Sequence, residues 1–247
     1  MISVHMFDRG DGVRLAVHHQ PGAGPTLLFL PGYMSNMTGT KATMLMDWAI
    51  ANGRACLLMD YSGCGRSAGL FDDGSIRRWA ADARAVADHF APGPLLLIGS
   101  SMGGWIMLHL ALALGSRIVG MLGIAAAPDF TRWGLALSAA DIERLAHAGF
   151  TERPSGYADT PYRYSRTFIS DAETACLLGD PIAIQAPARL LHGMADDAVP
   201  SAISIRLAEQ LMSPDVQVVL IKGGDHRLSA PAELALLLHH VQELSCA

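Results

Sequence analysis

Short apolar runs alternate along the chain with longer segments in which apolar residues recur every three or four positions. The runs are bounded by Gly, Pro and Asp, and most are apolar throughout, which is typical of strands that are covered on both faces. They occupy residues 26–30, 55–59, 95–98, 118–124, 189–192 and 216–221. A hairpin is predicted before them, with strands at residues 2–7 and 13–19 and a turn at Arg9-Gly10-Asp11-Gly12.

Three of the longer segments have recognisable helix N-termini. Ser75 is a capping residue before the first, Pro200-Ser201 begins the second and Pro231 begins the third. The side chains expected to face inward are Ile76, Trp79, Ala83, Val86 and Phe90, then Ile205, Ala208, Leu211 and Met212, then Leu234, Leu237, Leu238, Val241 and Leu244. Alternation of strands and helices predicts an α/β fold, with a mostly parallel sheet flanked by helices on both faces.

The alternation is interrupted at residues 129–186. The pattern there predicts no strand and two helical pieces, at residues 138–149 and 170–179. Because the segment is inserted between two core strands, we expect a small helical cap over the sheet. No internal repeat and no low-complexity linker is present, so residues 1–247 are expected to form a single domain that carries this insertion.

A glycine-flanked serine follows the run at residues 95–98 and precedes a helical pattern. Gly99-Ser100-Ser101-Met102-Gly103 fits G-x-S-x-G, in which a sharp turn lifts the central serine above the sheet. Side chains at positions 99 and 103 would collide with the neighbouring backbone in such a turn. A phosphate-binding loop is excluded because no Lys follows the glycines. The spacing therefore predicts Ser101 as a nucleophile.

A serine hydroxyl needs a base, and the base needs a carboxylate that orients it. His226 follows the last predicted strand, and Asp196 follows the strand before it, so both lie at the sheet edge that also holds Ser101. Asp197 adjoins Asp196 but fits the loop pattern less well. Asp129 also follows a strand and is the main alternative, so the choice of acid stays open between Asp196 and Asp129.

Two backbone N–H groups are expected to bind the oxygen that becomes negative during acyl transfer. One belongs to Met102, directly after the nucleophile. The other is assigned to Tyr33, in the loop Leu30-Pro31-Gly32-Tyr33 after an earlier strand, where Gly32 permits close approach of a substrate. These two N–H groups form the predicted oxyanion hole.

Composition excludes several classes of partner. The net charge of −5 argues against nucleic acid, and no apolar run is long enough to span a membrane. We expect no metal, because the sequence has no HExxH and its paired histidines diverge, and no cofactor is indicated. The four cysteines are scattered and the N-terminus does not resemble a secretion signal, so a cytoplasmic location is expected.

These residues together resemble the α/β-hydrolase superfamily, and the resemblance extends over the whole chain. Asp60-Tyr61-Ser62-Gly63-Cys64-Gly65-Arg66-Ser67 is similar to the D-x-x-G-x-G-x-S turn of that superfamily. Residues 31–42, residues 99–105 and Asp225-His226-Arg227 resemble the abhydrolase-type acyl-protein (palmitoyl) thioesterases, a group that includes mycophenolic acid acyl-glucuronide esterase. The resemblance implies a serine hydrolase with Ser101, His226 and Asp196 as its triad, acting on palmitoylated proteins or acyl glucuronides.

The substrate of such an enzyme would be an ester or acyl thioester, either a small molecule or an acylated protein. A small-molecule carboxylesterase would use the same machinery, and a catalytically inactive binding module would keep the same scaffold. The cap concentrates aromatic residues that could wall an apolar acyl slot, with several arginines among them. These residues are Phe130, Trp133, Phe150, Tyr157, Tyr162, Tyr164 and Phe168, and Arg132, Arg163 and Arg166.

Overall fold

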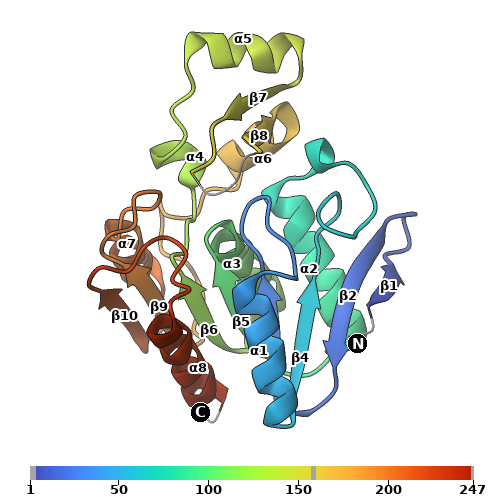
Figure 1. Ribbon diagram of the computed structural model, residues 1–247, viewed down its shortest axis with the longest axis vertical. Coiled ribbons are helices and arrows are strands. Elements are labelled where there is room, and N and C mark those ends of the chain that lie inside the picture. The colour runs from blue at the N-terminus through green and yellow to red at the C-terminus, as the bar shows by residue number, and fades with distance from the viewer. Residues whose placement is uncertain (1–3, 157–159, 246–247) are drawn as a thin grey trace.

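The computed structural model describes residues 4–156 and 160–245. Tyr157, Cys246 and residues 2–3 of the predicted hairpin lie outside this range. An eight-stranded sheet runs through the described molecule in the order β1-β2-β4-β3-β5-β6-β9-β10 (Figure 1). Its strands are β1 (His5–Asp8), β2 (Arg14–Gln20), β3 (Ala23–Leu30), β4 (Arg54–Met59), β5 (Leu95–Ser100), β6 (Ile118–Ile124), β9 (Ala188–Gly193) and β10 (Val216–Ile221).

The pairing from β4 to β10 is parallel throughout, and β2 is antiparallel to both β1 and β4. The predicted α/β fold with a mostly parallel sheet is therefore confirmed. Parallel strands bring the loops after β5, β9 and β10 to one edge of the sheet, which is where such sheets place their ligand sites.

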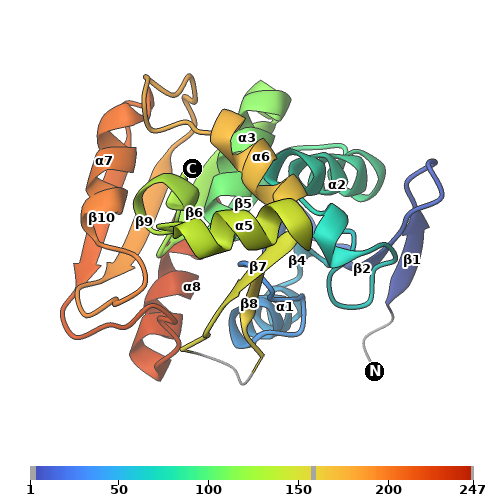
Figure 2. The same cartoon turned by 90° about the horizontal axis from the view of Figure 1, so that it is seen from above.

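Helices cover both faces of the sheet, as Figure 2 shows from above. Two of them, α1 (Thr40–Ala51) and α8 (Pro231–Ser245), pack on one face, where Leu45, Met46 and Leu237 are buried. The other face is covered by α2 (Ile76–Phe90), α3 (Met102–Leu114) and α7 (Ala202–Gln210). Two short 3₁₀ helices occupy Phe71–Asp73 and Gly115–Arg117.

The predicted helix starts are mostly accurate, but the buried face predicted for α7 is wrong in part. Ser75 Oγ accepts a hydrogen bond from the Arg78 N–H at 3.3 Å and caps α2, which buries Trp79 as expected. Leu211 is buried as expected, but Ile205 and Met212 are 44% and 52% exposed, and Ile203 and Leu207 are buried in their place. Apolar residues occur on both faces of α7, so the sequence alone did not settle which face packs on β9 and β10.

The segment between β6 and β9 lies above the edge of the sheet at which β5 ends (Figure 1). It contains α4 (Phe130–Trp133), α5 (Ala139–His147), β7 (Phe150–Arg153), β8 (Tyr162–Ser165) and α6 (Arg166–Thr174). The expectation that it holds no strand is wrong, because β7 and β8 pair antiparallel. Strands of four residues are too short to show a clear alternation of apolar and polar side chains.

The second predicted cap helix also starts earlier than expected. Ser165 Oγ accepts a hydrogen bond from the Phe168 N–H at 3.0 Å, which fixes the start of α6 at Arg166 rather than at residue 170. The first cap helix begins as predicted at Ser138, whose side chain forms a reciprocal capping box with Asp141. Asp141 also accepts hydrogen bonds from Thr151 and Arg153, so it joins α5 to β7.

Candidate active site

Ser101 occupies the sharp turn between β5 and α3. Its backbone φ of 53° is in the left-handed region, which is uncommon for a residue other than glycine and marks local strain. A Cβ at Gly99 would lie 2.6 Å from the Gly103 carbonyl oxygen, and one at Gly103 would lie 2.0 Å from the Leu30 carbonyl oxygen. Glycine is therefore required at both positions for the turn to close.

The loops after β5, β9 and β10 bring three predicted side chains together. Ser101 Oγ lies 3.1 Å from His226 Nε2, and His226 Nδ1 lies 2.8 Å from Asp196 Oδ2. The Asp196 side chain is fully buried, and the imidazole of His226 is 14% exposed. A donor at Nδ1 and an acceptor at Nε2 satisfy both contacts, with the Ser101 hydroxyl donating to the ring.

The loop itself holds Asp196 in place. Its Oδ1 accepts hydrogen bonds from the Ala198 N–H at 2.9 Å and the Val199 N–H at 2.8 Å. Burial raises the pKa of Asp196, but hydrogen bonds from His192, His226 and Val199 outweigh it and hold that pKa below its usual range. Asp196 is therefore ionised at neutral pH.

The alternative acid, Asp129, lies elsewhere in the hydrogen-bond network. Its carboxylate accepts hydrogen bonds from the backbone N–H groups of Leu177 and Leu178, at 2.8 to 3.0 Å, and it is buried. Asp129 thus joins the end of β6 to the chain that returns from the cap. The structure places Asp196, rather than Asp129, against His226.

Two other carboxylates brace the loops around the site. Asp60 accepts hydrogen bonds from the Met37 N–H at 2.7 Å and from the Arg66 N–H at 2.8 Å, so it ties the loop after β3 to the loop after β4. Asp225 accepts from the N–H groups of Arg227 and Leu228 and shapes the turn that carries His226.

The two predicted oxyanion donors flank Ser101. Met102 is the first residue of α3, so its N–H precedes the intrahelical hydrogen bonds and points along the positive end of the helix. Tyr33 follows Gly32, at which a Cβ would lie 3.3 Å from the Ser100 carbonyl oxygen. Tyr33 and Met102 both line the cavity at Ser101.

The side chain of Tyr33 has a second contact that the sequence did not reveal. Its hydroxyl donates to the Arg163 carbonyl oxygen at 2.5 Å, and its ring stacks on Tyr164 with 5.1 Å between centroids. The residue predicted to supply an oxyanion N–H therefore also contacts the cap through its side chain.

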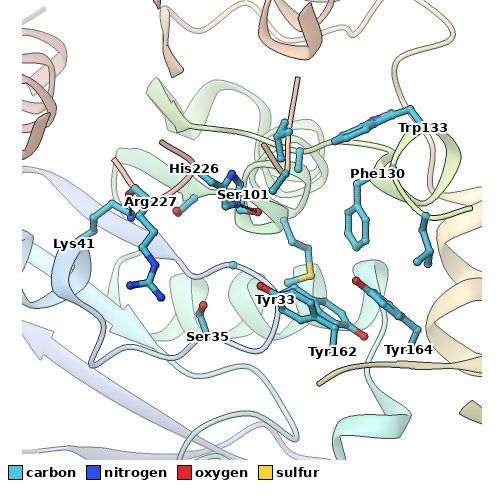
Figure 3. A pocket seen from close by; sticks show the side chains of 18 residues that line it. Tyr33, Ser35, Lys41, Ser101, Phe130, Trp133, Tyr162, Tyr164, His226 and Arg227 are labelled. Atoms are coloured by element: carbon cyan, nitrogen blue, oxygen red, sulfur yellow. Dashed lines mark hydrogen bonds between the residues drawn. The ribbon is translucent and has the colours of Figure 1, made fainter. Parts of the chain in front are cut away.

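A cavity of about 310 Å³ lies directly over Ser101 and has two unlike sides (Figure 3). One side is aromatic and comes mainly from the cap: Tyr33, Phe130, Trp133, Tyr162 and Tyr164. The opposite side carries Ser35, Lys41 and Arg227. A second hollow of about 340 Å³ adjoins the polar side and shares those three residues.

Only some of the cap aromatic residues, and none of the three cap arginines named from the sequence, line the cavity. Phe168 is buried behind the aromatic side, and Phe150 lies under the guanidinium of Arg163, 3.3 Å from ring centroid to Cζ. Arg163 forms a two-point hydrogen bond with Asp72 of the core, and Arg132 donates to the Glu173 carbonyl oxygen. The cations that line the cavity are instead Lys41 and Arg227, which the sequence reasoning missed.

Within residues 4–156 and 160–245, no group of three or more His, Cys, Asp or Glu side chains is arranged to hold a metal ion. In the same ranges, no helix combines the length and the apolar character needed to cross a membrane.

Comparison with known proteins identifies the family. A model described as the alpha/beta hydrolase family matches residues 27–235, which is most of the chain. The chain belongs to the alpha/beta hydrolase family. The expectation of a hydrolase of this superfamily is thereby confirmed.

Individual members of this alpha/beta hydrolase family resemble the chain over almost its full length. A human protein named palmitoyl-protein thioesterase ABHD10, mitochondrial, is 37% identical over 244 residues, which cover 98% of this chain and 80% of the human protein. Two solved structures match with TM-scores of 0.93 and 0.89, at 36% and 37% identity. They are a putative hydrolase from Agrobacterium vitis S4, covering 99% of both chains, and mouse alpha/beta hydrolase domain-containing protein 10, covering 98% of both.

These relatives confirm the predicted resemblance to acyl-protein thioesterases, and this alpha/beta hydrolase is an enzyme of the class that cleaves esters and thioesters. They contradict the expected cytoplasmic location, since the human relative is named as a mitochondrial protein. The expectation rested on scattered cysteines and on an N-terminus unlike a secretion signal. Neither observation distinguishes one reducing compartment from another.

Proposed function

We propose that this hydrolase cleaves acyl thioesters and carboxylic esters through an acyl-enzyme on Ser101, with His226 as the base and Asp196 as the orienting acid. The observation that carries the proposal is the hydrogen-bond chain from Asp196 through His226 to Ser101 Oγ, at 2.8 and 3.1 Å, under a cavity with an aromatic side. This geometry is what nucleophilic acyl transfer by a serine needs.

In the first half of the reaction, Ser101 Oγ attacks the carbonyl carbon of the substrate and its proton passes to His226 Nε2. The hydrogen bond from Nδ1–H to Asp196 keeps the acceptor nitrogen turned toward the serine and stabilises the imidazolium that forms. The N–H groups of Met102 and Tyr33 bind the oxyanion. When the carbon–sulfur or carbon–oxygen bond breaks, His226 gives its proton to the departing thiolate or alkoxide.

In the second half, water attacks the acyl ester on Ser101, and His226 Nε2 accepts the water proton. The tetrahedral intermediate collapses, the carboxylic acid leaves, and the proton on His226 returns to Ser101 Oγ. The same two N–H groups serve both intermediates, because the carbonyl oxygen occupies the same place in each. Each cycle therefore consumes one water molecule and leaves the enzyme unchanged.

The aromatic side of the cavity is proposed to bind the acyl chain. Phe130, Trp133 and Tyr162 present apolar surface there, and burial of each methylene contributes about 0.8 kcal/mol. The name of the human relative, a palmitoyl-protein thioesterase, supports a long acyl group. A chain longer by four carbons would then gain roughly two orders of magnitude in kcat/KM.

The side that carries Lys41 and Arg227 is proposed to hold the leaving group. Lys41 Nζ donates to the Arg227 carbonyl oxygen and lies 3.4 Å from Ser229 Oγ, so the three residues form one polar wall. An alkyl chain gains nothing from two cations, whereas an acidic leaving group is stabilised by them. The adjoining hollow of about 340 Å³ gives such a group room.

The domain assignment belongs to the same proposal. We infer that residues 1–247 form one domain in which the insertion at about 129–186 acts as a cap. Four of its aromatic residues, Phe130, Trp133, Tyr162 and Tyr164, line the cavity, and this supports a role in substrate binding rather than in holding the fold alone.

A panel of p-nitrophenyl esters and acyl thioesters, from acetyl to palmitoyl, tests the function. The proposal predicts that kcat/KM rises with acyl length across short and medium chains, for esters and thioesters alike. A flat or falling dependence would remove the acyl slot and indicate a small-molecule carboxylesterase. Labelling with a fluorophosphonate probe tests the other alternative, because a catalytically inactive binding module would not react.

A further inference from the structure

A second histidine lies behind the proposed acid. His192, on β9, and Ser204, on α7, are both fully buried, and His192 Nδ1 lies 2.7 Å from Ser204 Oγ. On the other side of the ring, Nε2 lies 2.8 Å from the Val199 carbonyl oxygen and 3.3 Å from Asp196 Oδ2. Both nitrogens of this buried ring thus have partners within the protein.

The partners determine where the proton of this ring lies. A carbonyl oxygen can only accept, so Nε2 must carry a hydrogen, which it donates to the Val199 carbonyl, and the Asp196 carboxylate lies beside the same N–H group. Nδ1 is then an acceptor for the Ser204 hydroxyl. A neutral ring with the proton on Nε2 satisfies every contact. In the opposite tautomer, the lone pair of Nε2 would point toward two oxygen atoms and be repelled by them.

Val199, in the loop after β9, forms hydrogen bonds with both His192 and Asp196. The Val199 N–H donates to Asp196 Oδ1, while the Val199 carbonyl accepts from His192. His192 therefore contacts both the turn and the carboxylate, and Asp196 Oδ2 lies 2.8 Å from His226 Nδ1 and 3.3 Å from His192 Nε2.

We propose that His192 is a positioning residue for the reaction, which holds Asp196 from behind through an Nε2–H group whose tautomer the Val199 carbonyl sets. The inference rests on the proposed function, since it concerns the acid of that triad. His192 touches neither the cavity nor Ser101, so it acts through Asp196 alone.

Two consequences follow if the donor is removed. Asp196 loses one of its fixed points, so its carboxylate is no longer held at the position that aligns His226. Its negative charge is also shared by fewer donors, so it binds His226 more strongly when that ring is protonated. The titratable groups that contact Asp196 are His192 from β9 and His226 from the loop after β10; Asp197, Asp225 and Arg227 are their charged neighbours along the chain.

The test compares His192→Leu with His192→Gln, which keeps an N–H donor near the position of Nε2. We expect His192→Leu to lower kcat by about 10- to 100-fold with little change in KM, and to move the acidic limb of the kcat/KM profile to higher pH. His192→Gln should recover most of the loss. His240→Leu is the matched control, because His240 is also buried and bonded to a carboxylate, on α8.

A folded His192→Leu enzyme whose kcat and acidic limb match those of the wild type would overturn the inference. If that variant does not fold, histidine ¹⁵N spectra of the unaltered enzyme decide: the inference requires a proton on Nε2 of His192, and a ring protonated on Nδ1 alone contradicts it. Asp196→Asn separates this failure from failure of the proposed function, since full activity of Asp196→Asn would remove the triad itself.

Discussion

The core side and the cap side of the cavity are held by different interactions. On the core side, Ser101, Asp196 and His226 each follow a strand of the same sheet, and backbone N–H groups or glycine contacts fix their loops. On the cap side, aromatic rings come from short elements that reach the core through arginine–carboxylate pairs, ring contacts and the Tyr33 hydroxyl.

The interactions on the two sides differ in strength. Arg163 and Asp72, which join β8 to the core, are 33% and 40% exposed, and such pairs contribute about 0–1 kcal/mol to stability. The core loops instead rest on a buried parallel sheet. Core variants should therefore change the rate for every substrate, while cap variants should change which substrates are preferred.

The largest effect is expected from Ser101→Ala. Without the nucleophile, kcat should fall by about 10⁶-fold for every substrate, because the remaining residues cannot form the acyl-enzyme. The fold should persist, since alanine replaces serine without a change of backbone. Steady-state kinetics together with circular dichroism measure this, and near-normal activity on any accepted substrate would refute the assignment.

Asp196→Asn should follow, with a loss on the order of 10⁴-fold in kcat. The amide would donate to His226 Nδ1 rather than accept from it, so the ring would present the wrong tautomer to Ser101. Asp129→Asn is the matched control, since it changes a buried carboxylate that contacts only the Leu177 and Leu178 backbone in the described hydrogen-bond network. The reverse ranking of the two variants would move the acid to Asp129.

A variant of the aromatic side should change selectivity more than rate. Phe130→Ala is expected to lower kcat/KM for medium and long acyl chains by about 10-fold and to leave acetyl substrates nearly unchanged, because only longer chains contact the ring. Phe150→Ala, in the cap but away from the cavity, is the control. Equal losses for all chain lengths would mean that Phe130 only supports the fold.

The polar side should respond to the charge of the leaving group. Lys41→Gln is expected to reduce kcat/KM for acidic leaving groups by about 3- to 10-fold relative to neutral ones. Burial lowers the pKa of Lys41, while Asp225 opposes that shift. Lys222→Gln, at an exposed position, is the control. An equal effect of Lys41→Gln on charged and neutral leaving groups would contradict this assignment.

The smallest effect is expected for Arg163→Gln, which should lower the free energy of unfolding by about 1 kcal/mol or less. The hydrogen bonds from Arg163 lower the pKa of Asp72, so this contribution is present above the unfolded pKa and is lost as the pH falls through the folded one. Urea unfolding at neutral and acidic pH measures the difference. A loss several times larger would mean that the cap is held as firmly as the core.

The difference between the core and the cap also explains which features the sequence could predict. Core strands of six or seven mostly apolar residues and the turn at Ser101 have strong local patterns, so the sequence predicts the sheet, with Ser101 and His226 at one edge of it. It left the acid open between Asp196 and Asp129. The cap hairpin could not be predicted in this way, because β7 and β8 have four residues each and depend on pairing with one another.

Contacts between segments that are distant in the chain could not be predicted from local sequence patterns either. Lys41 and Arg227 are 186 positions apart and meet only because α1 and the loop after β10 reach the same cavity. His192 belongs to the predicted strand at residues 189–192, and nothing in its spacing indicates Ser204 as its partner. The HGMADDAV segment does place His192 four residues before Asp196, which is the one local signal that could have suggested a contact.

The most direct test of the central claim is to trap the acyl-enzyme. The wild-type enzyme is mixed with a palmitoyl thioester, quenched in acid within one turnover, and digested for mass spectrometry. The account predicts a palmitoyl group on the peptide that contains Ser101, and none on that peptide from Ser101→Ala. An acyl group on another residue, or turnover without any acylated peptide, would contradict it.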